Sequence, residues 1–194
     1  MTAGADPEDL YGRLLSADHL EPARLLTSQA MAELGGLNAN SGDPQLARAR
    51  VGRAALDATA LASETELRAS IVARCPSRRW PEQRLLLSAV DAETGEFVTL
   101  HDESGKELID AVVASCALPF AYPLATAMGR RWIDGFIRSP VNVDLATGYP
   151  RIVVLAPMVD GFGPTGRVPT RSASCHSARV RILPWSSLTP PSMP

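Results

Sequence analysis

The dipeptide Asp134-Gly135 is the strongest candidate for chemistry in this sequence of 194 residues. It follows Trp132-Ile133, a pair typical of a strand, so the carboxylate is expected at a strand end, where α/β sheets bind their ligands. A carboxylate in such a position can act as a general base. Gly135 allows a sharp turn with positive φ and a close approach of the backbone to a substrate. The competing interpretation is an ordinary Asp-Gly turn, which the dipeptide alone favours.

The cysteines and histidines give little support to a metal site. The adjacent pair Cys175-His176, with Cys75 or Cys116 as a further ligand, lacks the C-x2-4-C spacing that structural zinc sites use. His19 and His101 are expected at the surface. We therefore predict no metal and no cofactor.

The sequence contains no glycine-flanked serine at a turn of the kind that exposes a nucleophile. These 194 residues contain no Gly-x-Ser-x-Gly, the turn that exposes a nucleophilic serine between a strand and a helix. Ser115 and Ser139 are alternative nucleophiles, but neither is flanked by glycine at such a turn. Ser115 is more simply explained as a residue that caps or packs the end of a helix.

The elements that would position Asp134 follow from the hydrophobic pattern. Helices are expected at about 6–15, 21–34, 44–60, 64–73 and 107–116. Strands are expected as a hairpin over 84–101, a tight hairpin over 125–134 that turns at Met128-Gly129, and a buried strand at 151–157. Strands that alternate with helices in this way indicate an α/β fold.

Three segments near Asp134 form a longer motif. Residues 114–123 read Ala-Ser-Cys-Ala-Leu-Pro-Phe-Ala-Tyr-Pro, residues 132–136 read Trp-Ile-Asp-Gly-Phe, and residues 139–146 end in Asp-Leu-Ala. This order resembles the third conserved block of the patatin-like phospholipases, the PNPLA family. The hairpin before the block and the strand after it are also similar to the family's. The resemblance covers roughly residues 6–160, and it is specific over residues 85–157 and weak before residue 85.

The resemblance implies a serine-aspartate dyad on a three-layer α/β/α fold, with the aspartate acting directly on the serine. Asp134 matches the dyad aspartate. Phe136 departs from the pattern, because the family has glycine or alanine there, and Gly35-Gly36 is better explained as a helix C-cap than as an oxyanion loop. We therefore expect a partial three-layer α/β/α fold that lacks its N-terminal strand, oxyanion loop and nucleophile elbow, which would lie before Met1.

The expected function is that of a patatin-like lipid acyl hydrolase, a phospholipase or esterase of lipid metabolism, whose dyad is reduced to Asp134. Such a chain would be inactive alone. The alternative is a non-catalytic remnant that binds lipid or protein. Lipid binding would use the apolar residues 118–124, although core packing explains these residues as well. A missing central strand would expose unpaired strand edges, so marginal stability or aggregation is expected.

Composition limits the partners and the location. The net charge of -2 gives no basis for nucleic-acid binding, and lipids or acyl esters are the partners that the resemblance implies. Three scattered cysteines favour a reducing compartment. No apolar run has the length of a membrane helix, and the first residues do not form a signal peptide. The expectation is a cytoplasmic protein with optional peripheral membrane contact, and its oligomeric state is left open.

The composition changes after Pro164. Residues 165–194 contain four arginines, five prolines and no acidic residue, and they show no sustained period. We predict a truncated patatin-like domain over 1–164, followed by a tail over 165–194 that is disordered or the product of a frameshift.

Overall fold

The computed structural model describes residues 34, 36–37, 42–58, 63–75, 77–127 and 129–154, together with the backbone of residues 155–156 and 179–184. The first predicted helix, at 6–15, and almost all of the second, at 21–34, lie outside these residues. Within them the chain forms helices and a four-stranded antiparallel sheet, so the predicted α/β class is confirmed.

The four-stranded sheet consists of two hairpins joined side by side. Its order is β2-β1-β4-β3, where β1 is Leu87–Asp91, β2 is Phe97–Leu100, β3 is Ala125–Ala127 and β4 is Arg130–Asp134. Both predicted hairpins are therefore confirmed. The central pair β1 and β4 is antiparallel, with Ala89 opposite Asp134 and Val90 opposite Ile133.

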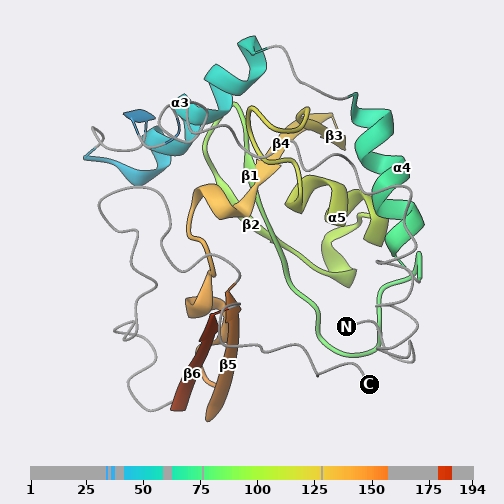
Figure 1. Ribbon diagram of the computed structural model, residues 1–194, viewed down its shortest axis with the longest axis vertical. Helices are drawn as coiled ribbons and strands as arrows, with labels where there is room; N and C mark the ends of the chain where they lie inside the picture. The colour runs from blue at the N-terminus through green and yellow to red at the C-terminus, as the bar shows by residue number, and fades with distance from the viewer. Residues whose placement is uncertain are drawn as a thin grey trace, which may run out of the picture.

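Helices cover both faces of this sheet. Ala89 and Trp132 belong to a core cluster shared with α4 (Glu64–Arg74) and α5 (Leu108–Ser115). Their neighbours Val90 and Ile133 belong to a second cluster shared with α3 (Pro44–Asp57). Because successive strand residues point to opposite faces, the described elements form three layers, with α3 on one side and α4 and α5 on the other (Figure 1).

Local sequence signals set the ends of α3 and α4. Asp43 caps α3 by accepting from the Gln45 N–H over 2.8 Å, and Pro44 occupies the first turn. Ser63 and Glu66 form a reciprocal capping box, so α4 starts as a new helix rather than continuing α3.

The turn of the first hairpin is fixed by the buried carboxylate of Asp91. Its Oδ1 accepts from the N–H groups of Glu93 and Thr94 over 3.0 and 2.9 Å, and Gly95 has φ +69°. Burial alone would raise the pKa of Asp91, but these hydrogen bonds and the nearby Arg130 hold it below its usual value. Asp91 is therefore a structural carboxylate of the hairpin.

A second, two-stranded sheet lies apart from the first in Figure 1. Strand β5 (Arg151–Ala156) runs parallel to β6 (Arg179–Pro184). The strand predicted at 151–157 is confirmed as β5, but it is not buried throughout, because Arg151 and Val153 are exposed whereas Ile152 and Val154 are buried. Strand β6 falls within the tail for which no regular structure was predicted, and the other residues of that tail lie outside the described part. The division at residue 164 stays a prediction.

No helix in the described part of the chain is both long enough and apolar enough to cross a bilayer.

Candidate active site

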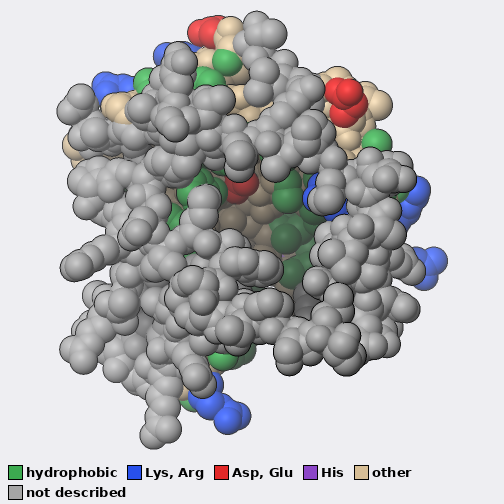
Figure 2. Space-filling view, viewed as in Figure 1, with side chains coloured by type: hydrophobic (Ala, Val, Ile, Leu, Met, Phe, Trp, Pro, Cys, Tyr) green, Lys and Arg blue, Asp and Glu red, His purple; other side chains and the backbone are tan. Residues whose placement is uncertain are grey.

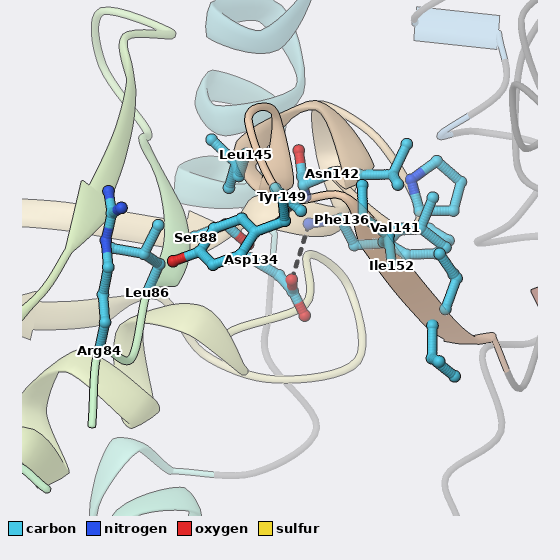
Figure 3. Close-up of a pocket in the computed structure, with 15 residues that line it drawn as sticks. Arg84, Leu86, Ser88, Asp134, Phe136, Val141, Asn142, Leu145, Tyr149 and Ile152 are labelled. Carbon is cyan, nitrogen blue, oxygen red and sulfur yellow. Dashed lines mark hydrogen bonds between the residues drawn. The ribbon is translucent and has the colours of Figure 1, made fainter. Parts of the chain in front are cut away.

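Asp134 is the last residue of β4, and it is anchored through its backbone and its side chain. Its N–H donates to the carbonyl oxygen of Ala117, just after α5, over 3.0 Å. Its Oδ1 accepts from the N–H of Phe136 over 2.8 Å, the bond that Figure 3 draws as a dashed line. The sheet, the segment after α5 and the following turn therefore all fix the position of this carboxylate.

The environment of Asp134 makes its carboxylate more basic than that of an ordinary aspartate. Burial raises the pKa of Asp134 to about 6, because the charged form loses hydration, and the hydrogen bond from the Phe136 N–H opposes this rise only in part. The side chain is consequently protonated in mildly acidic solution and mostly ionised at neutral pH.

Gly135 is required at this turn for a reason that the sequence did not indicate. Its φ is not positive, so the turn does not use the left-handed conformation that glycine allows. A Cβ at this position would instead lie 2.2 Å from the Oγ of Ser88 and 2.6 Å from its carbonyl carbon. The close approach is therefore to strand β1, and only glycine lets the turn after Asp134 lie against that strand.

Asn142 ties this turn to the segment that follows. It has a left-handed backbone, with φ 43° and ψ 39°, a conformation that asparagine tolerates better than most residues. Its Nδ2 lies 3.2 Å from the carbonyl oxygen of Gly135, 2.9 Å from that of Ser139 and 3.4 Å from the Oγ of Ser88. One amide group thus links β1, the Asp-Gly turn and the loop before η3 (Val143–Ala146).

Arg138 holds Asn142 from its other side. Its guanidinium donates to Oδ1 of Asn142 over 2.8 Å and to both carboxylate oxygens of Asp144, over 2.9 and 2.5 Å. It also lies 4.3 Å from the ring centre of Phe97 on β2. The hydrogen bonds from Arg138 lower the pKa of Asp144, although burial acts in the opposite direction. The Asp-Leu-Ala segment, identified only as part of a motif, is therefore bound to the turn that bears Asp134.

A cavity of about 750 Å³ opens beside Asp134. Most of the described residues that line it are apolar: Leu86, Phe136, Pro140, Val141, Val143, Leu145, Ala146, Tyr149, Ile152, Val153 and Val154. Its remaining described lining residues are Arg84, Ser88, Asp134 and Asn142. Figure 2 shows one face of the molecule hollowed near its centre, with hydrophobic and acidic side chains visible inside, and Figure 3 shows Asp134 between the two ends of this lining.

The two serines considered as alternative nucleophiles do not line the cavity. Ser115 ends α5, and the Oγ of Ser139 accepts from the N–H of Asn142 over 3.2 Å. Ser88, which no pattern in the sequence singled out, does line it. Among the described residues no hydrogen bond joins Asp134 to a serine side chain.

The other residues considered from sequence lie elsewhere or outside the described part. His101 is 3.6 Å from Asp102, and its side chain is 37% exposed, in keeping with a surface position. Cys75 donates from its Sγ to the carbonyl oxygen of Ser77 over 3.0 Å, and Cys116 follows α5; neither residue lines the cavity. His19 and the pair Cys175-His176 lie outside the described residues.

The apolar segment 118–124 takes part in the core. Leu118 and Phe120 pack against the cluster on the α3 side of the sheet, and Leu124 is buried within it. Phe120 has φ +67°, a strained value for an aromatic residue, so packing must hold this backbone in place. Core packing thus accounts for at least these three side chains.

Comparison with known proteins connects this geometry to a family. The family model of the patatin-like phospholipases matches residues 6–147, which include Asp134, the Asp-Gly turn and the segment bound by Arg138. No curated protein matches the chain significantly. Since the family match covers most of the 194 residues, the chain belongs to the patatin-like phospholipase family.

Proposed function

We propose that Asp134 is the general base of a serine-aspartate ester hydrolase, and that the adjacent cavity holds the acyl chain of a lipid ester. The observation that supports this most strongly is a carboxylate at a strand end, beside an apolar cavity, with a pKa raised to about 6. Such a group is mostly ionised at neutral pH and is a stronger base than an exposed aspartate, which suits proton abstraction. The family, whose members act on lipid esters, supports the substrate class.

The hydrogen bonding of Asp134 leaves one oxygen available for this role. Oδ1 accepts from the Phe136 N–H, while Oδ2 accepts from no described residue. In a dyad of this kind the serine hydroxyl gives its proton to the carboxylate as its oxygen attacks the ester carbonyl. The alcohol then leaves with that proton, and an acyl-serine remains. Water attacks the acyl-serine, again giving its proton to the carboxylate, and the fatty acid is released as the serine recovers its proton.

The nucleophile of this reaction has no counterpart among these residues. No serine of the sequence lies in Gly-x-Ser-x-Gly, and Ser88, the one described serine that lines the cavity, packs against Gly135. We therefore propose that the 194 residues alone bind acyl chains and hydrolyse no ester.

The test of the catalytic part compares the chain with its Asp134→Asn variant, using 4-nitrophenyl laurate and a fluorophosphonate that labels active serines. Both proteins should show background hydrolysis and no labelling. Labelling of the chain that disappears in the variant would overturn the proposal that it is inactive alone. If the reading frame upstream of Met1 encodes Gly-x-Ser-x-Gly, the longer protein should hydrolyse the ester, and Asp134→Asn should lower its kcat by roughly 10²- to 10⁴-fold.

The test of the binding part measures the affinity of monomeric 1-dodecanol by calorimetry. Leu145→Glu places a charge in the cavity lining and should abolish binding. Leu46→Glu makes the same change at a leucine on α3 that is 45% exposed and outside the lining, so it should leave binding unchanged. Equal affinity in the two variants would contradict acyl binding in this cavity.

A further inference from the structure

Arg84 carries a positive charge at the edge of the cavity without a partner among the described residues. Its side chain is exposed, it lines the cavity, and no hydrogen bond or ion pair joins it to another described residue. Other arginines of the chain are paired: Arg138 with Asp144, and Arg68 with Asp110. Within the described part of the chain, the charge of Arg84 is therefore not compensated by an acidic side chain.

The second charge of the lining, Asp134, does not neutralise Arg84. No ion pair joins the two residues, and the pKa of Asp134 reflects burial and the Phe136 N–H without a contribution from Arg84. In the view of Figure 3, Arg84 lies at one end of the lining residues and Asp134 lies among them. A ligand with an anionic group is consequently attracted at the Arg84 end and repelled near ionised Asp134, so the two charges define one orientation.

The cavity that Arg84 lines has mostly apolar walls, as a site for an amphiphile requires. Leu86, two residues further along the chain, lines the cavity with Leu145. Tyr149 and Val153 also line it and are 49% and 65% exposed, so part of the apolar lining is accessible to solvent. A cavity lined by a cation and by accessible aromatic and aliphatic side chains suits a molecule with a charged group and a hydrocarbon chain.

We propose that Arg84 selects acyl ligands with an anionic group, binding that group at the cavity edge while the hydrocarbon chain lies along the apolar lining. This inference rests on the proposed function, because it assumes that the cavity accepts an acyl chain. It assigns to one residue the choice between anionic and neutral lipids. A phosphate and a carboxylate share the required chemistry.

The experiment compares three probes with the same twelve-carbon chain: dodecyl phosphate, dodecanoate and 1-dodecanol, each below its micelle concentration. At least one anionic probe should bind about tenfold more tightly than the alcohol, a value in keeping with a charge-assisted hydrogen bond at an accessible site. Arg84→Gln should remove this difference and leave the affinity for the alcohol unchanged. Arg84→Lys should restore part of it.

The control variant is Arg79→Gln, which removes the same charge from an exposed arginine outside the cavity lining and should change no affinity. A preference for the phosphate or for the carboxylate identifies the anionic group, and either supports the inference. Equal binding of all three probes, or an unchanged preference in Arg84→Gln, overturns it while acyl binding stands. Failure of every probe to bind removes the proposed acyl site itself.

Discussion

The side-chain amide of Asn142 donates to the carbonyl oxygen of Gly135 over 3.2 Å, and so connects a left-handed residue of one loop to the turn that bears Asp134. The same amide reaches Ser139 and Ser88, and its oxygen is held by Arg138. This connection makes Asn142 a structural support of the candidate base, and its removal has a specific expected result.

Replacing Asn142 by glycine should loosen the turn without straining the backbone. Glycine keeps the left-handed conformation but removes the amide, so the free energy of unfolding should fall by about 1–2 kcal/mol. Amide exchange of the Phe136 N–H, which donates to Asp134, should become faster. Urea unfolding and hydrogen exchange measure the two effects.

Asn142→Ala should lower the free energy of unfolding by about 1 kcal/mol more than Asn142→Gly, because alanine resists positive φ. Unchanged exchange at Phe136 in both variants would show that Asn142 does not support the turn.

Substitution of Gly135 by alanine should destabilise the protein by about 1–3 kcal/mol, because the new Cβ overlaps strand β1. Thermal unfolding measures this loss. Removing the hydroxyl of Ser88 should not restore the lost stability. The Cβ added at position 135 would still lie 2.4 Å from the Cβ of residue 88 and 2.6 Å from its carbonyl carbon. Full recovery in the double variant Gly135→Ala with Ser88→Ala would mean that the hydroxyl alone sets this contact.

The raised pKa of Asp134 gives a pH dependence of stability with a definite sign. Between pH 3.8 and about 6 the unfolded chain has released the proton while the folded chain retains it, so stability falls as pH rises through this window. Above about pH 6 the buried charge of Asp134 lowers the free energy of unfolding by about 3 kcal/mol, an order-of-magnitude value. Asp134→Asn keeps an acceptor for the Phe136 N–H and carries no charge, so it should be more stable than the parent at pH 7.5.

Urea unfolding at pH 4 and pH 7.5 checks this expectation. Asp134→Asn should increase the free energy of unfolding strongly at pH 7.5 and only slightly at pH 4, because at pH 4 the parent side chain is largely protonated in the folded state. Asp144→Asn serves as the contrast, because the pKa of Asp144 is lowered by Arg138 and its replacement should reduce stability at pH 7.5. A gain from Asp134→Asn that is equal at both pH values would contradict a raised pKa.

Gly52→Ala tests the packing of α3 on the sheet. A Cβ at this position would lie 2.0 Å from the carbonyl oxygen of Ala92, so the helix would have to move away from the residue that follows β1. We expect a loss of more than about 1 kcal/mol in thermal unfolding, although alanine is the better helix former. Ala54→Gly, at a partly exposed position on the same helix, gives the cost of propensity alone, about 1 kcal/mol. A stabilising effect of Gly52→Ala would show that α3 is not packed this closely.

Local signals predicted most of the described elements. Asp43-Pro44 marks the start of α3, and the glycines Gly95 and Gly129 mark the two hairpin turns, because each of these effects acts within a few residues. The alternation of Ala89 and Val90 between the two core clusters likewise follows from strand geometry.

The contacts that complete the candidate site could not be predicted in this way. The reason for Gly135 is its contact with Ser88, which is 47 residues away in the sequence, and no period or turn signal reports such a pair. Asn142 and Arg138 have no unusual local pattern, and their importance follows from hydrogen bonds across three segments. The place of Arg84 at the cavity edge depends on the assembled fold in the same way.

The joining of two hairpins through β1 and β4 has a consequence for folding kinetics. Each hairpin closes a short loop and can form within microseconds, whereas the pairing of Ala89 with Asp134 must close a much longer loop. The surroundings of Asp134 are therefore completed only when the hairpins meet. A folding intermediate with both hairpins formed separately would contain most of the strand structure, yet Asp134 would still titrate as an ordinary solvated aspartate.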